Sequence, residues 1–339
     1  MPFRPDEQFH PPRWLRNRHV QSMLASTVAR RAAIERRTAP VQAAQQQMLL
    51  DCGDGVRLQC FRSSAPGGSG VPAVILHGWE GSAQSLYVLS LAQQLFECGF
   101  DVVRLNLRDH GDTHHLNRDL FHSCRLSDLV GALCALQTEF AGQALHLAGF
   151  SLGGNFLLRA AAAQAGLDIA RVVAVSPVLD PGETLLALER SFPGYQLYFA
   201  RKWMRSLLKK QALWPQHYDF QGIGRLAGLR RMTTELVRRF TEFATLEDYL
   251  NGYAITGGRL ARLDVPARII TSLDDPIIPA HGLQRLARAP SLRLTLTRYG
   301  GHCGFLERLN GPSWVEREIV AELKSGLAPQ RSARRFSSN

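Results

Sequence analysis

The serine at position 151 lies in a local pattern that suits a nucleophile. The run Gly149-Phe150-Ser151-Leu152-Gly153 follows an apolar stretch, Ala144–Ala148, and precedes an alanine-rich stretch, Phe156–Ala165. A serine between a strand and a helix projects its hydroxyl freely only from a very tight turn, and the small residues on both sides relieve the crowding of such a turn. The pattern therefore predicts a catalytic serine rather than a glycine-rich turn that merely contains one.

A serine hydroxyl needs a base, and the base needs a carboxylate that orients it. In a parallel sheet these groups gather at the carboxyl ends of the strands. His302 follows the last expected strand, Leu292–Arg298, in a glycine-containing loop and is the predicted base. Asp274 and Asp275 follow the preceding strand, Ala267–Ser272. Neighbouring residues at a strand end point in different directions, and the pattern Asp-x-apolar-apolar-Pro favours Asp275 as the carboxylate.

The oxyanion of a tetrahedral intermediate needs two backbone N–H donors. Leu152, directly after the serine, is expected to supply the first. The loop after the first parallel strand, His77-Gly78-Trp79-Glu80-Gly81, is expected to supply the second from the backbone of Trp79. These residues together predict a serine hydrolase that cleaves carboxylic esters, such as a small-molecule ester, with no cofactor and no metal.

The elements that must hold these residues alternate along the chain. Met48–Cys52 and Val56–Arg62 flank Gly53-Asp54-Gly55, which predicts a β-hairpin. Between residues 73 and 175, short apolar strands alternate with helices, which predicts an α/β fold with a mostly parallel sheet and helices on both faces. Residues 183–256 contain no convincing strand and are rich in Leu, Arg and aromatic residues, which predicts a helical cap insertion.

The predicted organisation has four parts. Residues 1–47 form a basic arm and linker, with a helix around Val20–Arg37 and a polar linker at Gln42–Gln47. The predicted core occupies residues 48–182 and 257–325, the cap occupies 183–256, and 326–339 form a disordered basic tail.

The net charge of +11 is unevenly distributed over these parts. Residues 1–40 hold eight Arg against three acidic residues, the cap eleven Lys or Arg against seven Asp or Glu, and the tail three Arg and no acid. The remainder holds 18 basic and 19 acidic residues. The surplus suits either solubility or an anionic membrane surface. Zinc-finger spacing, RNP-like aromatics and a basic heptad helix are all missing, so nucleic acid is not an expected partner.

Cysteine usage and hydropathy indicate a compartment. The six Cys show no C-x-x-C pair, and the N-terminus has no signal-peptide pattern. No run reaches roughly 18 consecutive apolar residues. We therefore expect a cytoplasmic protein with reduced thiols.

Between about Trp14 and Lys324, the chain resembles the YheT-like, embryogenesis-associated branch of the α/β-hydrolases. The resemblance is carried by Trp14–Gln21, His77-Gly78, Ser85-Leu86-Tyr87, Asn106-Leu107-Arg108, Gly149–Asn155, Asp274-Asp275-Pro276, Gly300–Leu306 and Trp314-Val315-Glu316. The chain order Ser151…Asp275…His302 is also the order of that superfamily. The resemblance implies the α/β-hydrolase fold, a triad of these three residues and carboxylesterase-type chemistry, with lipid-like esters as substrates because some relatives are phospholipases.

One loop departs from the family, which usually has a small-residue turn after the Arg108 position. Here Asp109–Asn117 contains three His and two Asp within seven residues, namely Asp109, His110, Asp112, His114 and His115. A zinc site is one interpretation, but the stretch lacks a companion ligand at helical spacing. A hydrogen-bonded loop that borders the pocket is the favoured interpretation.

Three other functions fit the same residues. A membrane-surface lipase or phospholipase would use the same triad, with the basic arm and cap on anionic lipid. A catalytically silent α/β-hydrolase fold would serve as a binding protein, although such proteins usually lose a triad member. An acyltransferase would pass the acyl group to an alcohol or thiol instead of water.

Overall fold

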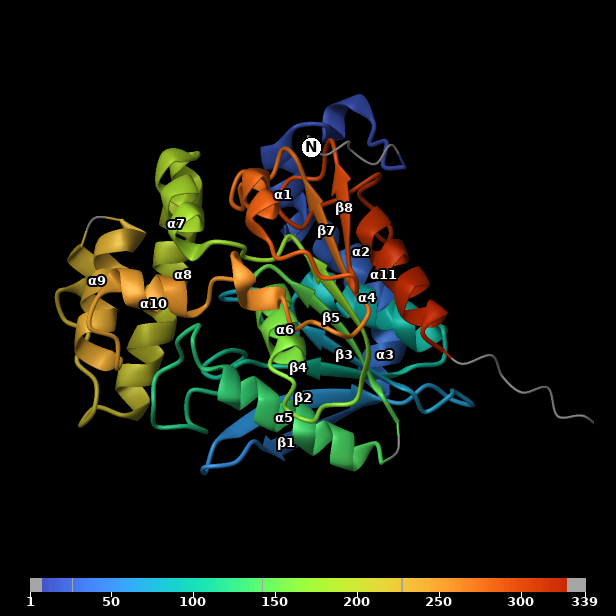
Figure 1. Cartoon of the computed structure of the whole chain (residues 1–339), viewed down its shortest axis with the longest axis horizontal. Helices are drawn as coiled ribbons and strands as arrows, with labels where there is room; N and C mark the ends of the chain where they lie inside the picture. The colour runs from blue at the N-terminus through green and yellow to red at the C-terminus, as the bar shows by residue number, and fades with distance from the viewer. Residues whose placement is uncertain (1–7, 26, 142, 227, 328–339) are drawn as a thin grey trace, which may run out of the picture.

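The computed structural model describes residues 8–25, 27–141, 143–226 and 228–327, and an eight-stranded sheet runs through them (Figure 1). Its spatial order is β1-β2-β4-β3-β5-β6-β7-β8. The strands are β1 (Gln45–Asp51), β2 (Arg57–Ser63), β3 (Pro72–Leu76), β4 (Asp101–Leu105), β5 (Leu145–Phe150), β6 (Ile169–Val175), β7 (Ala267–Ser272) and β8 (Leu292–Thr297). The pairs β1/β2 and β2/β4 are antiparallel and the others are parallel, so the predicted hairpin and mostly parallel sheet are confirmed.

Eleven α-helices are described around this sheet. They are α1 (Arg18–Leu24), α2 (Val28–Arg37), α3 (Ala39–Ala43), α4 (Leu86–Glu97), α5 (Leu126–Glu139), α6 (Leu152–Ala162), α7 (Pro181–Arg190), α8 (Pro193–Leu213), α9 (Leu229–Phe240), α10 (Leu246–Gly252) and α11 (Trp314–Ser325). Short 3₁₀ turns occur at η1 (Arg13–Leu15), η2 (Ile223–Arg225), η3 (Gly258–Leu260) and η4 (Ala280–Arg285). Among the residues described, no helix combines the length and apolar character needed to cross a bilayer.

Alternation along the strands divides the core into two layers. In β3, the side chains of Val74 and Leu76 enter the core layer that α5 and α6 cover, whereas Ala73 and Ile75 enter the layer under α4 and α11. All residues of β3 are buried, because helices cover both faces of the sheet. The predicted helices on both faces are therefore confirmed.

The predicted helical insertion is confirmed between β6 and β7. Helices α7 to α10 gather beside the sheet, on the side away from α11 (Figure 1). Part of this insertion packs in a small separate cluster, which includes Leu207, Ile223, Met232 and Leu236 together with Leu120 from the loop after β4. The longest helix, α8, spans 21 residues and packs against α7 and α9.

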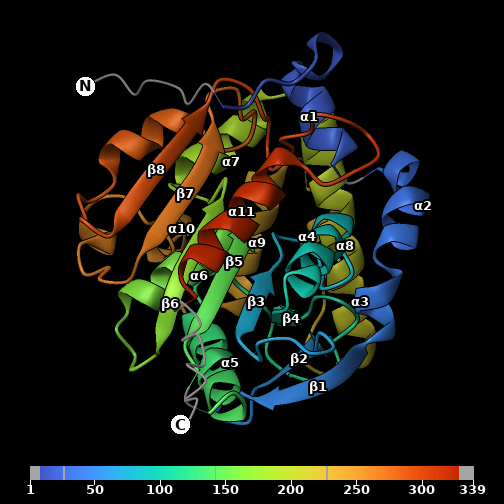
Figure 2. The same cartoon turned by 90° about the vertical axis from the view of Figure 1, so that its right-hand side faces the viewer.

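The N-terminal segment differs from the prediction in two details. Thr27 has an extended backbone and begins α2, so two helices replace the single helix expected over Val20–Arg37. Gln45–Gln47 are not a linker but the start of β1, where they pair with Phe61–Ser63 of β2. Cross-strand pairing here overrides a weak local preference for strand. Helices α1 to α3 run along one side of the molecule (Figure 2), and α2 and α3 contact α4. Residues 328–339 of the predicted tail lie outside the described residues.

Candidate active site

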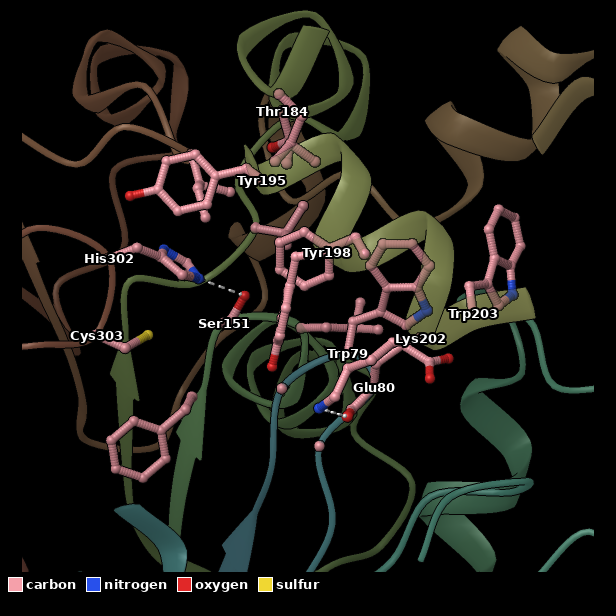
Figure 3. Close-up of a pocket in the computed structure, with 18 of the residues that line it drawn as sticks. Trp79, Glu80, Ser151, Thr184, Tyr195, Tyr198, Lys202, Trp203, His302 and Cys303 are labelled. Atoms are coloured by element: carbon pink, nitrogen blue, oxygen red, sulfur yellow. Dashed lines mark hydrogen bonds between the residues drawn. The ribbon is translucent and has the colours of Figure 1, made fainter. Parts of the chain in front are cut away.

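Ser151 occupies a strained turn between β5 and α6. Its backbone has φ 52° and ψ −120°, a region that residues with a side chain rarely adopt. Two backbone hydrogen bonds hold this conformation: Ser151 N donates to Val175 O at 2.8 Å, and Asn155 N donates to Ser151 O at 3.1 Å. The turn directs the hydroxyl into a cavity (Figure 3).

The glycines around Ser151 allow α6 to lie directly against β3 and β5. A Cβ atom at Gly153 would lie 2.4 Å from the carbonyl oxygen of His77 and 2.6 Å from that of Leu76. A Cβ atom at Gly149 would lie 2.7 Å from the carbonyl carbon of Gly153. Backbone atoms cannot move aside as a flexible side chain can, so both positions require glycine.

The structure brings the predicted base and carboxylate to Ser151. His302 Nε2 lies 3.0 Å from Ser151 Oγ (Figure 3), and His302 Nδ1 lies 2.9 Å from Asp275 Oδ2. The other carboxylate oxygen of Asp275 accepts hydrogen bonds from Ile277 N at 2.8 Å and Ile278 N at 2.9 Å. The Asp275 side chain is fully buried, so its orientation toward the imidazole is fixed.

Asp274 points elsewhere. Its Oδ1 accepts a hydrogen bond from the backbone N–H of Gly301 at 2.9 Å, which ties the end of β7 to the loop that carries His302. The two neighbouring carboxylates therefore have separate positions, one on the imidazole and one on the loop backbone.

The electrostatic surroundings of His302 favour its charged form. Burial lowers the pKa of His302, but Asp275 and then Cys303 raise it more strongly, so the pKa lies well above its usual value. A carboxylate that stabilises an imidazolium is what proton removal from Ser151 requires.

The loop Gly78–Gly81 lies against Ser151 and is held at several points. A Cβ atom at Gly78 would lie 3.1 Å from Ser151 Cβ. Gly78 N donates to Tyr87 Oη at 3.0 Å, and Glu80 N donates to His110 Nε2 at 3.2 Å. From α8, Lys202 Nζ donates to Glu80 O at 2.9 Å (Figure 3).

His110 is a neutral acceptor in this arrangement. Its Nδ1 lies 2.7 Å from the carbonyl oxygen of Arg108 and must carry the proton, which leaves Nε2 to accept from Glu80 N. Burial lowers the pKa of His110 to about 4. His77 is arranged alike, with Nδ1 donating to Gly78 O and Nε2 accepting from Leu107 N.

Two backbone N–H groups beside Ser151 are available to a substrate. Within the described residues, neither Trp79 N nor Leu152 N donates a hydrogen bond to the protein. These are the two donors that the sequence predicts for an oxyanion. The Trp79 indole also stacks on Phe199 of α8, with ring centroids 5.3 Å apart, so it both lines the cavity and packs under the insertion.

The His- and Asp-rich loop after β4 is bound to α8. Lys210 Nζ donates to Asp109 Oδ1 at 2.8 Å and to Asn117 O at 2.5 Å. His114 Nε2 lies 2.8 Å from Ser206 Oγ. His115 is exposed. In the part of the chain that the structure describes, no cluster of three or more His, Cys, Asp or Glu could hold a metal ion. The loop is thus an attachment point for the insertion.

The cavity above Ser151 has a volume of about 810 Å³. Some of its lining residues are apolar and come from the insertion and from the loop after β7, with Leu185, Leu188, Leu229, Leu250 and Ile277. Others are polar and come from α2, α8 and the loop before α4, with Arg31, Lys202, Glu80, Ser82 and Gln84. The lining therefore offers apolar contacts for a chain and polar contacts for a charged or hydrogen-bonding group.

Sequence reasoning missed three residues of this site. Lys202 reaches Glu80 across 122 positions, and Ser22 of α1 accepts a hydrogen bond from His302 N across 280 positions. Local sequence carries no signal for either contact. His110 belongs to the His- and Asp-rich loop after β4, but its support of the Glu80 backbone depends on how β3 and β4 lie side by side.

Comparison with known proteins identifies the family of this chain. A family model described as alpha/beta hydrolase fold matches residues 72–309. The chain belongs to the α/β-hydrolase fold family. This α/β-hydrolase is 27% identical over 332 residues to the Escherichia coli protein named "Putative esterase YheT", covering 94% of this chain and 93% of the relative. The expected resemblance to the YheT-like branch is confirmed.

Two further relatives extend the comparison. Human phospholipase ABHD3 is 22% identical over 319 residues, which cover 89% of this chain and 74% of the relative. The solved structure of the Pyrococcus furiosus esterase Pf2001 has a TM-score of 0.56 at 15% identity, and the match covers 86% of this chain and 95% of that one. The structural similarity to Pf2001 shows a shared fold. Because the relatives include proteins named as esterases and phospholipases, they support hydrolase activity for this chain.

Proposed function

We propose that this protein hydrolyses carboxylic esters, with Ser151 as nucleophile, His302 as general base and acid, and Asp275 as the orienting carboxylate. The observation that carries the proposal is the unbroken hydrogen-bonded line from Asp275 through His302 to Ser151 at the base of a cavity. An activated nucleophile is recognised by this mutual geometry.

The first half of the reaction forms an acyl-enzyme. Ser151 Oγ bonds to the ester carbonyl carbon while its proton passes to His302 Nε2, and the carbonyl electron pair moves onto oxygen. The N–H groups of Trp79 and Leu152 stabilise that oxyanion. When the intermediate collapses, the bond to the alcohol oxygen breaks and His302 returns its proton to the leaving alcohol.

The second half restores the free enzyme. A water molecule gives its proton to His302 as its oxygen attacks the acyl carbon. The bond to Ser151 Oγ then breaks, and Oγ takes the proton back, which releases the carboxylic acid. Asp275 holds the imidazole in the tautomer with a proton on Nδ1 and stabilises the imidazolium in both halves.

We propose an ester with an apolar acyl chain as the substrate class. The apolar lining contributed by the insertion suits such a chain. One relative is named a phospholipase, which supports a lipid-like ester. Residues 183–256 would act as the cap that covers the acyl chain, above a core formed by residues 48–182 and 257–325.

Labelling with a fluorophosphonate probe tests the proposal. The wild type should be labelled on Ser151, and Ser151→Ala should lose labelling while keeping its fold. Ser123→Ala is a matched control, because Ser123 also lines the cavity, where it is hydrogen-bonded to the phenol of Tyr249. Labelling that persists in Ser151→Ala would show that a different residue is the nucleophile. A well-folded wild type that is never labelled would favour a catalytically silent binding protein. Turnover of p-nitrophenyl esters of increasing chain length then measures the acyl preference.

A further inference from the structure

The charged side chains of helix α8 are all basic. Its 21 residues contain five Lys or Arg and no Asp or Glu. Lys202 and Lys210 turn inward, to Glu80 O and to Asp109. Arg201 and Arg205 are exposed, and neither forms an ion pair with any described residue. The outer side of α8 therefore presents guanidinium groups that the protein does not neutralise.

The same outer side carries large apolar side chains. Leu197 is 50% exposed and Leu208 is 53% exposed. The spacing of 197, 201, 205 and 208 is three or four residues, which places them on one side of a helix. Single exposed leucines are ordinary, but a half-exposed apolar row interleaved with arginine is an amphipathic surface of the kind found at bilayer interfaces.

This surface continues to the mouth of the cavity. Phe192, directly before α8, is 56% exposed, Tyr198 is 49% exposed, and both line the cavity. Met23 of α1 is 47% exposed and lines the cavity as well. Helix α1 touches α8 here, because His19 Nδ1 lies 3.1 Å from Tyr195 Oη. A molecule or membrane bound to the outer side of α8 would therefore contact the entrance of the cavity that contains Ser151.

Two arginines near the N-terminus serve the fold. Arg30 is buried and donates to the carbonyl oxygens of Leu309 and Gly311. Arg37 donates to the hydroxyl of Ser90. These arginines are committed to internal contacts, so the unpaired cations of α8 are the stronger candidates for an external anion.

We propose that the outer side of α8, formed by Leu197, Arg201, Arg205 and Leu208 with Phe192 and Met23 at the cavity mouth, docks on an anionic lipid bilayer. The apolar side chains enter the boundary between headgroups and acyl chains, and the guanidinium groups bind lipid phosphate. Charge favours this occupant over a second copy of the chain, since two copies of the surface would bring arginine against arginine. The inference goes beyond ester hydrolysis, because docking does not need Ser151.

Co-sedimentation of the full chain with vesicles tests the proposal. The wild type and Ser151→Ala should both bind vesicles of phosphatidylcholine with phosphatidylserine, and bind pure phosphatidylcholine much less. Arg201→Gln/Arg205→Gln should weaken binding about 30-fold, at roughly fivefold for each basic residue lost near an anionic surface. Leu197→Gln/Leu208→Gln should weaken it about tenfold or more. None of these four side chains lines the cavity, so turnover of a soluble ester should be unchanged.

Matched controls remove the same chemistry elsewhere. Arg36→Gln/Arg288→Gln removes two exposed charges, and Leu49→Gln/Leu309→Gln removes two exposed leucines; none of the four residues belongs to α8. Both controls should bind as the wild type does. An equal loss in the arginine control would show attraction by net charge alone and overturn the proposal. Absence of vesicle binding, together with a change of oligomeric state in Leu197→Gln/Leu208→Gln, would overturn it in favour of a second copy. Ser151→Ala should lose esterase activity and still bind vesicles. Failure of the docking proposal can therefore be distinguished from failure of the proposed chemistry.

Discussion

The side-chain oxygen of Ser22 accepts a hydrogen bond from the backbone N–H of His302 at 2.8 Å, across 280 positions of the chain. The Ser22 hydroxyl itself donates to Arg18 O at 2.7 Å. A Cβ atom at Gly301 would lie 2.5 Å from that same carbonyl oxygen. Helix α1 is therefore packed directly on the loop that carries the proposed base, and the N-terminal segment contributes to the position of the imidazole.

Replacing Ser22 with Ala should slow turnover without unfolding the protein. The variant leaves the His302 N–H without its acceptor, and small misplacements of a catalytic group are costly, so kcat should fall roughly tenfold or more with KM unchanged. Steady-state kinetics on a short soluble ester measures both constants. Ser22→Thr keeps the hydroxyl and should restore kcat. If KM rose while kcat held, Ser22 would be a substrate contact rather than a positioning residue.

Replacing Asp275 with Asn should lower kcat by about 10⁴-fold, because the amide favours the wrong imidazole tautomer. The pH profile should also move. His302 acts as a base only when neutral, and its raised pKa means that kcat/KM of the wild type rises with pH through an inflection above 6.5. Without the Asp275 carboxylate the lowering effect of burial remains, so the inflection should shift to lower pH. Asp274→Asn is the matched control, since Asn can still accept from Gly301 N and should keep the wild-type inflection.

Replacing Glu80 with Gln should stabilise the protein at alkaline pH. Burial raises the pKa of Glu80 from its usual 4.5 to about 7, although the nearby charge of Lys202 lowers it. The folded state therefore binds this proton more tightly than the unfolded chain, and stability falls as pH rises from about 4.5 to about 7. Gln cannot ionise, so urea unfolding at pH 8 should show a gain of up to about 3 kcal/mol that shrinks toward pH 5. A gain that is the same at both pH values would show that the carboxylate charge is not its cause.

Replacing Lys210 with Met should destabilise the fold by about 3–5 kcal/mol. Lys210 and Asp109 are 0% and 3% exposed, and removal of the cation leaves a buried carboxylate without its partner. Urea unfolding measures the loss. Lys210→Met/Asp109→Asn should recover much of it, because no unpaired charge remains. Lys209→Met is the neighbouring control: Lys209 pairs with the highly exposed Asp112, so its loss should cost less than about 1 kcal/mol.

Predictions from the sequence succeed where the chemistry is local. The hairpin at Gly53-Asp54-Gly55 follows from residues that accept positive φ, and all three adopt it. The strands and helices around Ser151 follow from apolar periodicity. Predictions fail where contacts with residues far away in the chain decide the local structure. Gln45–Gln47 form a strand because β2 pairs with them, and α2, which follows the N-cap residue Thr27, packs against α4.

The sequence by itself determined the turn at Ser151, since glycines at 149 and 153 answer steric demands between residues close in the chain. It also placed Asp275 and His302 after the last two strands, because strand ends of a parallel sheet meet at one edge. Only the tertiary structure decided that Ser22 holds His302, that Lys202 holds the loop of Trp79, and that Lys210 joins the insertion to the loop after β4. Each of these bonds joins groups far apart in the chain. Their formation depends on how helices pack in three dimensions, which no local run of residues encodes.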